Sequence, residues 1–157
     1  MKNTRQTTLC ILKRENEILL AMKKRGFGVG KYNGVGGKVE PGETPEQAMI
    51  RETHEEINVI PTKYENVGYI EFDEYYKGQK ENIAFHLYMV YEWEGTPSES
   101  DEMNPEWFSI DKIPYDKMLP DDKYWLPLVL DGKKVEAYFN FDEEWNLLSK
   151  NIQERNF

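Results

Sequence analysis

A segment in the first third of the chain, running from a pair of glycines into a cluster of acids, carries unusually complete helix signals. Thr44 is a favourable N-cap, and Gln47 three residues later completes a capping box. Pro45 fits the first helical position, where its missing N–H costs nothing. Asn58 can adopt the left-handed conformation that often follows a helix. The segment therefore predicts a helix from Pro45 to about Ile57.

Three glutamates share one face of this helix. At about 100° per residue, Glu52, Glu55 and Glu56 project in similar directions. The neighbouring face is expected to pack on the core, and it carries Met49, Ile50, Thr53 and Ile57. Like charges on adjacent turns repel one another, and a hard divalent cation such as Mg²⁺ or Mn²⁺, which takes oxygen ligands, would offset that repulsion. A solvated acidic face is the alternative interpretation of three such glutamates taken alone.

The full spacing of this segment resembles the Nudix box, G-x5-E-x7-R-E-U-x-E-E-x-G-U, in which U is aliphatic. The matching positions are Gly37, Glu43, Arg51, Glu52, Glu55, Glu56 and Val59. Two positions depart from the pattern, because Thr53 stands at an aliphatic position and Asn58 replaces the final glycine. Thr is β-branched and can pack, and Asn is the next-best residue for a left-handed cap, so neither change affects the acidic face.

The resemblance extends beyond the box to the oxidised-purine nucleoside triphosphatases of the MutT class. The matching runs are residues 22–28, 33–34, 36–39, 99–103 and 120–122. This resemblance implies an α/β fold, the Nudix α/β/α sandwich with a mixed β-sheet. No repeat or linker divides the chain, so a single domain over residues 1–157 is expected.

Hydrophobic patterning supports a mixed sheet flanked by helices. The strands that we expect are Thr7–Leu12, Glu17–Met22, Tyr64–Phe72, Ala84–Trp93 and Val135–Phe141. A short helix is expected over Tyr124–Leu130, after an acidic segment that follows Phe108–Ile113.

The net charge limits the classes of partner, and the cysteine content limits the chemistry of the thiol. The 157 residues carry a formal net charge of −9, which argues against binding to a nucleic-acid polymer or an anionic membrane. The single Cys10 lies in an apolar run, where a buried inert thiol is expected and no internal disulfide is possible. We recognise no signal peptide and no apolar span of eighteen residues. A cytoplasmic monomer is the corresponding expectation.

The resemblance implies hydrolysis of a phosphoanhydride by a metal-activated water, giving a nucleoside monophosphate and pyrophosphate. It assigns Glu52, Glu55 and Glu56 to Mg²⁺, with the Gly36 carbonyl as a further ligand. Arg51 is expected to pair with Glu43 and hold the loop against the helix. A further ligand or general base is expected at Glu102, for which an exposed loop acid is the alternative interpretation. Which glutamate takes the proton from water is left open.

The same resemblance and the side-chain chemistry suggest a nucleotide pocket. Asn33 offers a donor and an acceptor to a purine edge. Asp121 and Asp122 form an acid pair, of which one member must be protonated to donate to a ring nitrogen or an oxo group. The alternative for this pair is an ordinary turn or helix start. Lys23 is the expected basic contact, and a strand end in solvent is its alternative; Lys38 belongs to a matching run.

The sequence offers alternatives for the aromatic walls of this pocket. The animal-type enzymes carry a Trp two positions before the acid pair, whereas this chain has Leu119, so the choice of base is open. Phe27 and Trp125 can supply aromatic walls, with core packing as the alternative for each. A nucleotide-pool enzyme acting on 8-oxo-dGTP is the leading expectation. The alternatives are hydrolysis of another nucleoside diphosphate derivative and nucleotide sensing without turnover.

Overall fold

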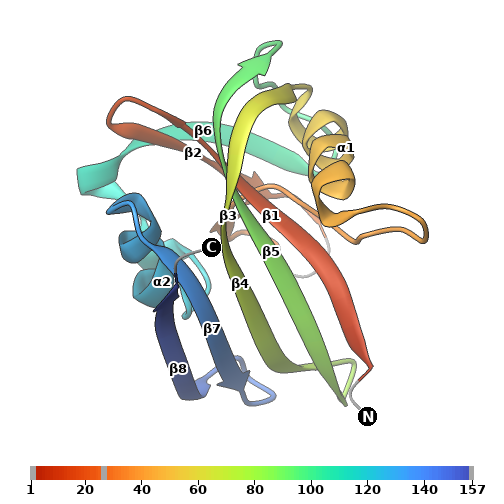
Figure 1. Ribbon diagram of the computed structural model, residues 1–157. Coiled ribbons are helices and arrows are strands. Elements are labelled where there is room, and N and C mark those ends of the chain that lie inside the picture. Colours follow the sequence, from red (N-terminus) through yellow and green to blue (C-terminus); the bar gives the residue numbers. More distant parts are fainter. Residues whose placement is uncertain (1–2, 26–27, 156–157) are drawn as a thin grey trace.

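The computed structural model of the protein describes residues 3–25 and 28–155. Within these residues, eight strands form one curved sheet that two α-helices flank (Figure 1). The strands are β1 (Thr4–Arg14), β2 (Glu17–Lys23), β3 (Tyr32–Asn33), β4 (Ile60–Tyr76), β5 (Gln79–Glu94), β6 (Met103–Ser109), β7 (Lys134–Phe141) and β8 (Leu147–Arg155). The helices are α1 (Pro45–Ile57) and α2 (Asp122–Leu130), with short 3₁₀ turns η1 (Ile110–Lys112) and η2 (Tyr115–Lys117).

The sheet is mixed, as the sequence predicts. Its order is β3-β2-β1-β5-β4-β7-β8, and β6 pairs with β2 outside this path. Strand β1 runs parallel to β5 and β4 runs parallel to β7, whereas the remaining pairs are antiparallel. A two-residue turn joins the long strands β4 and β5 at Lys77 and Gly78, which both have positive φ, 52° and 78°. This backbone suits a tight hairpin connection.

Alternation along β1 shows how the helices enclose the sheet. Leu9 and Ile11 pack in the same buried cluster as Leu126 of α2. Cys10 and Leu12, on the opposite face, pack in a second cluster with Met49 of α1. The two helices therefore cover opposite faces of the sheet, and the predicted α/β/α sandwich is confirmed (Figure 1).

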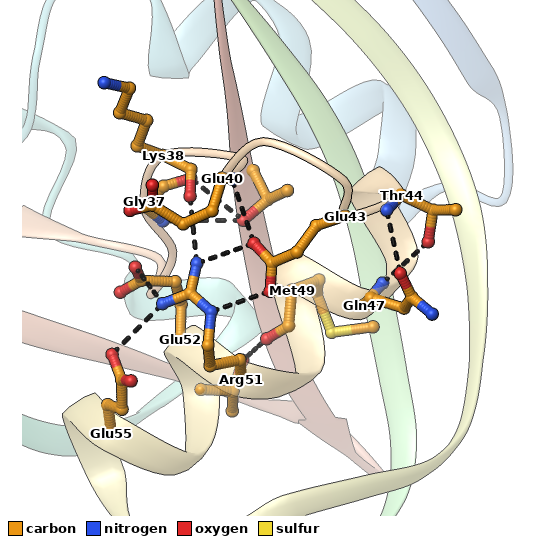
Figure 2. Close-up of polar contacts among 12 residues, drawn as sticks. Gly37, Lys38, Glu40, Glu43, Thr44, Gln47, Met49, Arg51, Glu52 and Glu55 are labelled. Carbon is orange, nitrogen blue, oxygen red and sulfur yellow. Dashed lines mark hydrogen bonds and ion pairs between the residues drawn. The ribbon is translucent and has the colours of Figure 1, made fainter.

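Helix α1 begins and ends where the sequence predicts. The Thr44 hydroxyl accepts a hydrogen bond from the Gln47 backbone at 3.1 Å, and the Gln47 side chain accepts one from the Thr44 backbone at 3.0 Å (Figure 2). At the other end Asn58 adopts the left-handed conformation, φ 64° and ψ 30°, and its N–H bonds the carbonyl of His54. These local caps fix the helix that carries the acids.

The other predicted elements are present but longer, and three strands, β3, β6 and β8, were not predicted. β4 and β5 extend the expected strands at both ends, and α2 begins two residues earlier than expected, at Asp122. Strand β6 includes Phe108 from the segment before η1, and β8 pairs with β7 along the sheet edge. In the part of the chain that the structure describes, no helix is long and apolar enough to cross a membrane.

Candidate active site

The glycine loop before α1 lies along the edge of β1. The backbones of Val35 and Cys10 exchange two hydrogen bonds, of 2.6 and 3.0 Å, and the Thr8 N–H donates to the Gly37 carbonyl at 2.8 Å. A methyl group at Gly36 would overlap the carbonyl oxygen of Thr8, so this close approach requires glycine. The loop is thereby held against the acids of α1.

Arg51 joins that loop to the helix, as the predicted pairing with Glu43 requires (Figure 2). Its Nε and Nη2 donate to the two Glu43 carboxylate oxygens at 2.8 and 2.9 Å, and Nη2 also donates to the Lys38 carbonyl at 3.1 Å. Its Nη1 donates to Glu52 at 2.9 Å and to Glu55 at 3.3 Å. The guanidinium lowers the pKa of Glu43 to about 2. One side chain thus fixes both the loop and two acids.

Glu56 differs from its helical-wheel expectation because it is buried. Its residue is 8% exposed, although the wheel places it on the acidic face with Glu52 and Glu55. The Gly36 N–H donates to its Oε2 at 3.3 Å. Burial raises the pKa of Glu56 to about 8, and the charges of Glu52 and Glu102 add to the effect. Burial also raises the pKa of Glu52. The glycine loop packs over α1 and buries Glu56. Because this loop lies twenty residues earlier in the sequence, the helical wheel alone does not show the burial.

The four glutamates expected to hold metal line one cavity of about 510 Å³. Its lining comprises Lys23, Arg25, Gly36, Gly37, Glu52, Glu55, Glu56, Ser100, Asp101 and Glu102. Glu102 is anchored through its carbonyl, which accepts from the Lys24 N–H at 2.9 Å, and its exposed carboxylate pairs with Arg25 at 3.4 Å. The structure therefore brings these residues together.

This set suits a hard divalent cation. All of its ligand atoms are oxygens, and positive charge would offset the repulsion from Glu52 and Glu102, which adds to the effect of burial on the pKa of Glu56. Among the described residues, no three acids or histidines are already arranged to hold an ion between them. Arg51 accounts for part of this, because its guanidinium already binds Glu52 and Glu55.

A second pocket, of about 340 Å³, adjoins the acid-lined cavity and shares Lys23, Gly36, Gly37 and Glu56 with it. Its lining includes three other residues expected at the nucleotide site, Asn33, Lys38 and Leu119. The sequence did not assign the other lining residues to a site, and these include Thr8, Glu74 and the apolar side chains Leu9, Phe72, Ile83, Phe85 and Trp145.

The acid pair lies at the inner end of this pocket. Asp121 and Asp122 are 2% and 3% exposed and line a small inner cavity of about 20 Å³ with Asn33, Leu119 and Trp125. Trp125 Nε1 donates to Asp121 Oδ2 at 2.8 Å, whereas Asp121 Oδ1 and Asp122 Oδ2 have no hydrogen-bond partner among the described residues. Burial raises the pKa of both carboxyls, which favours retention of a proton by the pair.

The aromatic expectations have different outcomes. Trp125 is 2% exposed and packs in the core, as the alternative interpretation expected. It also lines the inner cavity, where its Nε1 donates to Asp121. Phe27 lies outside the described residues. Phe72 and Phe85 stand within predicted strands, and for Phe72 the polar neighbours Glu71 and Asp73 were a signal that it faces one side of the sheet.

The two departures from the Nudix pattern are accommodated locally. Thr53 is fully buried, its hydroxyl donates to the Met49 carbonyl at 2.7 Å, and it lies 3.0 Å from Cys10 Sγ. Asn58 takes the left-handed cap. Cys10 itself is buried as expected, and burial raises its pKa to about 12, which makes the thiol unreactive.

Comparison with known proteins agrees with this fold and geometry. Residues 3–129 match the model of the NUDIX domain. The chain is 41% identical to the oxidized purine nucleoside triphosphate hydrolase of Mus musculus, over 98% of this chain and 97% of that protein. It is 45% identical to the protein of the same name from Danio rerio, over 90% and 89%. A crystal structure of a MutT protein from Bacillus halodurans superimposes with a TM-score of 0.84 at 25% identity, covering 95% of this chain and 97% of that one.

The chain therefore belongs to the Nudix family. It is a Nudix hydrolase, an enzyme of the class that acts on phosphoanhydride bonds and requires divalent cations.

Proposed function

We propose that this protein hydrolyses oxidised purine nucleoside triphosphates, 8-oxo-dGTP among them, to the monophosphate and pyrophosphate. One observation carries the proposal: the buried pair Asp121 and Asp122 lies beside a pocket that adjoins the glutamate-lined cavity, and two oxygens of the pair have no hydrogen-bond partner among the described residues. The names of the mouse and zebrafish relatives support the same substrate class.

The base end of the site has the groups that an oxidised purine needs. Oxidation at C8 adds an oxo group and a ring N–H, which are an acceptor and a donor. A protonated carboxyl in the pair donates to the oxo group, and an ionised one accepts from the N–H. Asn33, whose Oδ1 accepts from the Gly34 N–H at 2.9 Å, keeps its amide N–H groups for a purine acceptor. Phe72 and Phe85 provide an apolar floor beneath the ring.

The phosphate end is formed by basic side chains and the acid cluster. Lys23 lines both cavities, and Lys38 lines the base pocket, so both lie where a triphosphate would extend between them. Glu52, Glu55, Glu56, Glu102 and the Gly36 carbonyl would hold Mg²⁺, for which Mn²⁺ is a substitute. A bound divalent cation lowers the pKa of water and offsets charge on phosphoryl oxygens. One carboxylate of this cluster accepts the proton of the attacking water, and Arg51 positions the cluster.

The cellular setting is part of the proposal. The net charge of −9 favours a free nucleotide, held locally by lysines and a cation, over a nucleic-acid polymer or an anionic membrane. A single domain over residues 1–157, acting as a cytoplasmic monomer that cleanses the nucleotide pool, fits this charge and the lone buried thiol.

Leu119 supports a second candidate of the same enzyme class. It is half-buried and lines both the base pocket and the inner cavity, at the position where the animal-type enzymes have Trp. A smaller side chain there leaves room for another nucleoside diphosphate derivative, such as a sugar nucleotide or a dinucleoside polyphosphate. A higher kcat/KM for these compounds than for any purine triphosphate would favour this candidate.

The proposal is tested by measuring pyrophosphate release from 8-oxo-dGTP with Mg²⁺ for the wild type, Glu56→Gln and Glu46→Gln. Glu46 lies on the same helix but is exposed and outside the acid-lined cavity, so it is the matched control. We expect Glu56→Gln to lose about a hundredfold or more in kcat, and Glu46→Gln to retain wild-type activity. Nucleotide binding without turnover in the wild type would instead identify a sensing domain.

A further inference from the structure

Glu74 is a buried carboxyl in the base pocket for which the proposed chemistry has no role. The residue is 5% exposed and lines the pocket beside Phe72, two positions earlier on β4. Side chains two residues apart on a strand project from the same face of the sheet. Glu74 and Phe72 therefore both project from the face on which α2 and the acid pair lie.

Among the described residues, the Glu74 carboxylate has no partner within hydrogen-bond distance. Its ion-pair partner is Arg5, whose Nη2 lies 3.8 Å from Glu74 Oε1, beyond hydrogen-bond distance. The same Nη2 is nearer to Glu81, at 3.3 Å, and the Arg5 side chain is partly exposed. Among the described residues, the Glu74 carboxylate accepts no hydrogen bond. Burying a carboxyl without such bonds is costly, and donors on a bound ligand would relieve that cost.

Glu74 and the acid pair line adjoining cavities, which share Asn33, Phe72, Phe85 and Leu119. Burial raises the pKa of Glu74 to about 7, Arg5 opposes this rise, and the charges of Glu81 and Asp121 add to it. The effect of Asp121 is consistent with their lining parts of one connected pocket. A base bound between these acids would present one edge to the pair and another to Glu74.

We propose that Glu74 is a specificity-determining residue that accepts hydrogen bonds from the N–H edge of a guanine-type base. That edge carries a ring N1–H and a 2-amino group side by side, and one carboxylate can accept from both. An adenine-type base presents an unprotonated N1 at the corresponding position, which an ionised carboxylate repels. The inference rests on the proposed function, because it assumes that the pocket holds the base.

The test measures binding instead of turnover, so that it does not depend on hydrolysis. Calorimetric Kd values for 8-oxo-dGMP and 8-oxo-dAMP are compared for the wild type, Glu74→Gln and Glu81→Gln at about pH 8, where a pKa of about 7 leaves Glu74 ionised. Glu81 also pairs with Arg5 but is outside the base pocket, so it controls for a lost charge beside Arg5.

We expect Glu74→Gln to weaken 8-oxo-dGMP binding by about tenfold or more, the loss typical of a hydrogen bond to a charged group. The affinity for 8-oxo-dAMP should change less than about twofold by comparison, and Glu81→Gln should alter neither. An equal loss for both ligands, no loss for either, or no binding by the wild type would overturn the inference.

A ligand-only comparison keeps the inference testable if the variant folds poorly. In the wild type, 8-oxo-dIMP differs from 8-oxo-dGMP only by lacking the 2-amino group. Weaker binding of 8-oxo-dIMP, by about fivefold or more, is expected if Glu74 accepts from that amino group. Equal affinities would contradict the assignment. Failure of hydrolysis alone would reject the proposed function while leaving this binding preference intact.

Discussion

Arg51 and Glu43 are joined by two parallel hydrogen bonds, Nε to Oε2 at 2.8 Å and Nη2 to Oε1 at 2.9 Å, across the start of α1 (Figure 2). The remaining N–H groups of the same guanidinium reach the Lys38 carbonyl, Glu52 and Glu55. The planar shape of arginine makes these contacts possible together. The position of the acid cluster relative to the glycine loop therefore depends on one side chain.

Arg51→Lys keeps the charge but loses the fork, so it is expected to impair catalysis more than folding. A lysine cannot hold both Glu43 oxygens and orient Glu52 at once. We expect kcat/KM to fall by about tenfold or more, because misplacement of catalytic groups is costly, with a small change in Tm. Arg155→Lys, at an exposed pair with Glu136, is the control. Unchanged kcat/KM in Arg51→Lys would contradict this role.

Alanine substitutions at the two loop glycines should have different effects. At Gly36 the new methyl group would meet the Thr8 carbonyl, which is part of β1, so we expect a large loss of Tm and of activity. At Gly37 it would meet the Glu52 carboxylate, which is the movable end of a side chain. Gly37→Ala should therefore fold with a small loss of Tm and lose activity as Glu52 is displaced. Equal losses of Tm in both variants would argue against this difference.

Stability without metal should fall as pH rises, through Glu56. Folding raises the pKa of this carboxyl from 4.5 to about 8, so the folded chain binds its proton more tightly than the unfolded chain does. Its stabilising contribution is full below about pH 4.5 and is lost as the pH rises toward about 8. We expect the Tm of chelator-treated protein to fall over this range, and to fall less in Glu56→Gln.

Added Mg²⁺ provides the complementary measurement. Cation binding requires deprotonated carboxylates, so the increase in Tm on adding Mg²⁺ should be larger at about pH 8 than at about pH 5. Glu56→Gln should show a smaller increase at both. A Tm that does not respond to Mg²⁺ at either pH would count against a cation site at these acids.

Leu119→Trp should strengthen base binding. Leu119 lines the same pocket as Phe72 and Phe85, where an indole could stack on a purine. Stacking on an aromatic side chain contributes about 1–3 kcal/mol, so KM for 8-oxo-dGTP is expected to fall by about tenfold. Leu148→Trp, on an exposed part of β8, is the control. A raised KM in Leu119→Trp would mean that the wild-type pocket is shaped for another substrate.

Features fixed by neighbouring residues could be predicted from the sequence. The bounds of α1 follow from Thr44, Gln47 and Asn58, all of which act within one turn of the helix ends. The buried strand β1 was visible as an apolar run, although only packing shows that its alternate residues serve two separate cores. The pairing of Arg51 with Glu43 followed from the family resemblance.

Features created by distant segments could not be predicted in the same way. Strand β8 is largely exposed and polar, and its conformation depends on pairing with β7. The burial of Glu56 requires the loop at Gly36, twenty residues earlier. Likewise Glu74, Phe85 and Trp145 reach one pocket from β4, β5 and the segment before β8. Their convergence is a property of the tertiary fold and has no local signal.

The central claim is that the buried acid pair selects an oxidised base, and the most direct test is kcat/KM for 8-oxo-dGTP against dGTP with Mg²⁺. We predict a preference of about a hundredfold or more, equivalent to about 2.7 kcal/mol, which is reduced in Asp121→Asn. A preference of less than about threefold, under 0.7 kcal/mol or so, would contradict the claim and direct the substrate search to other nucleoside diphosphate derivatives.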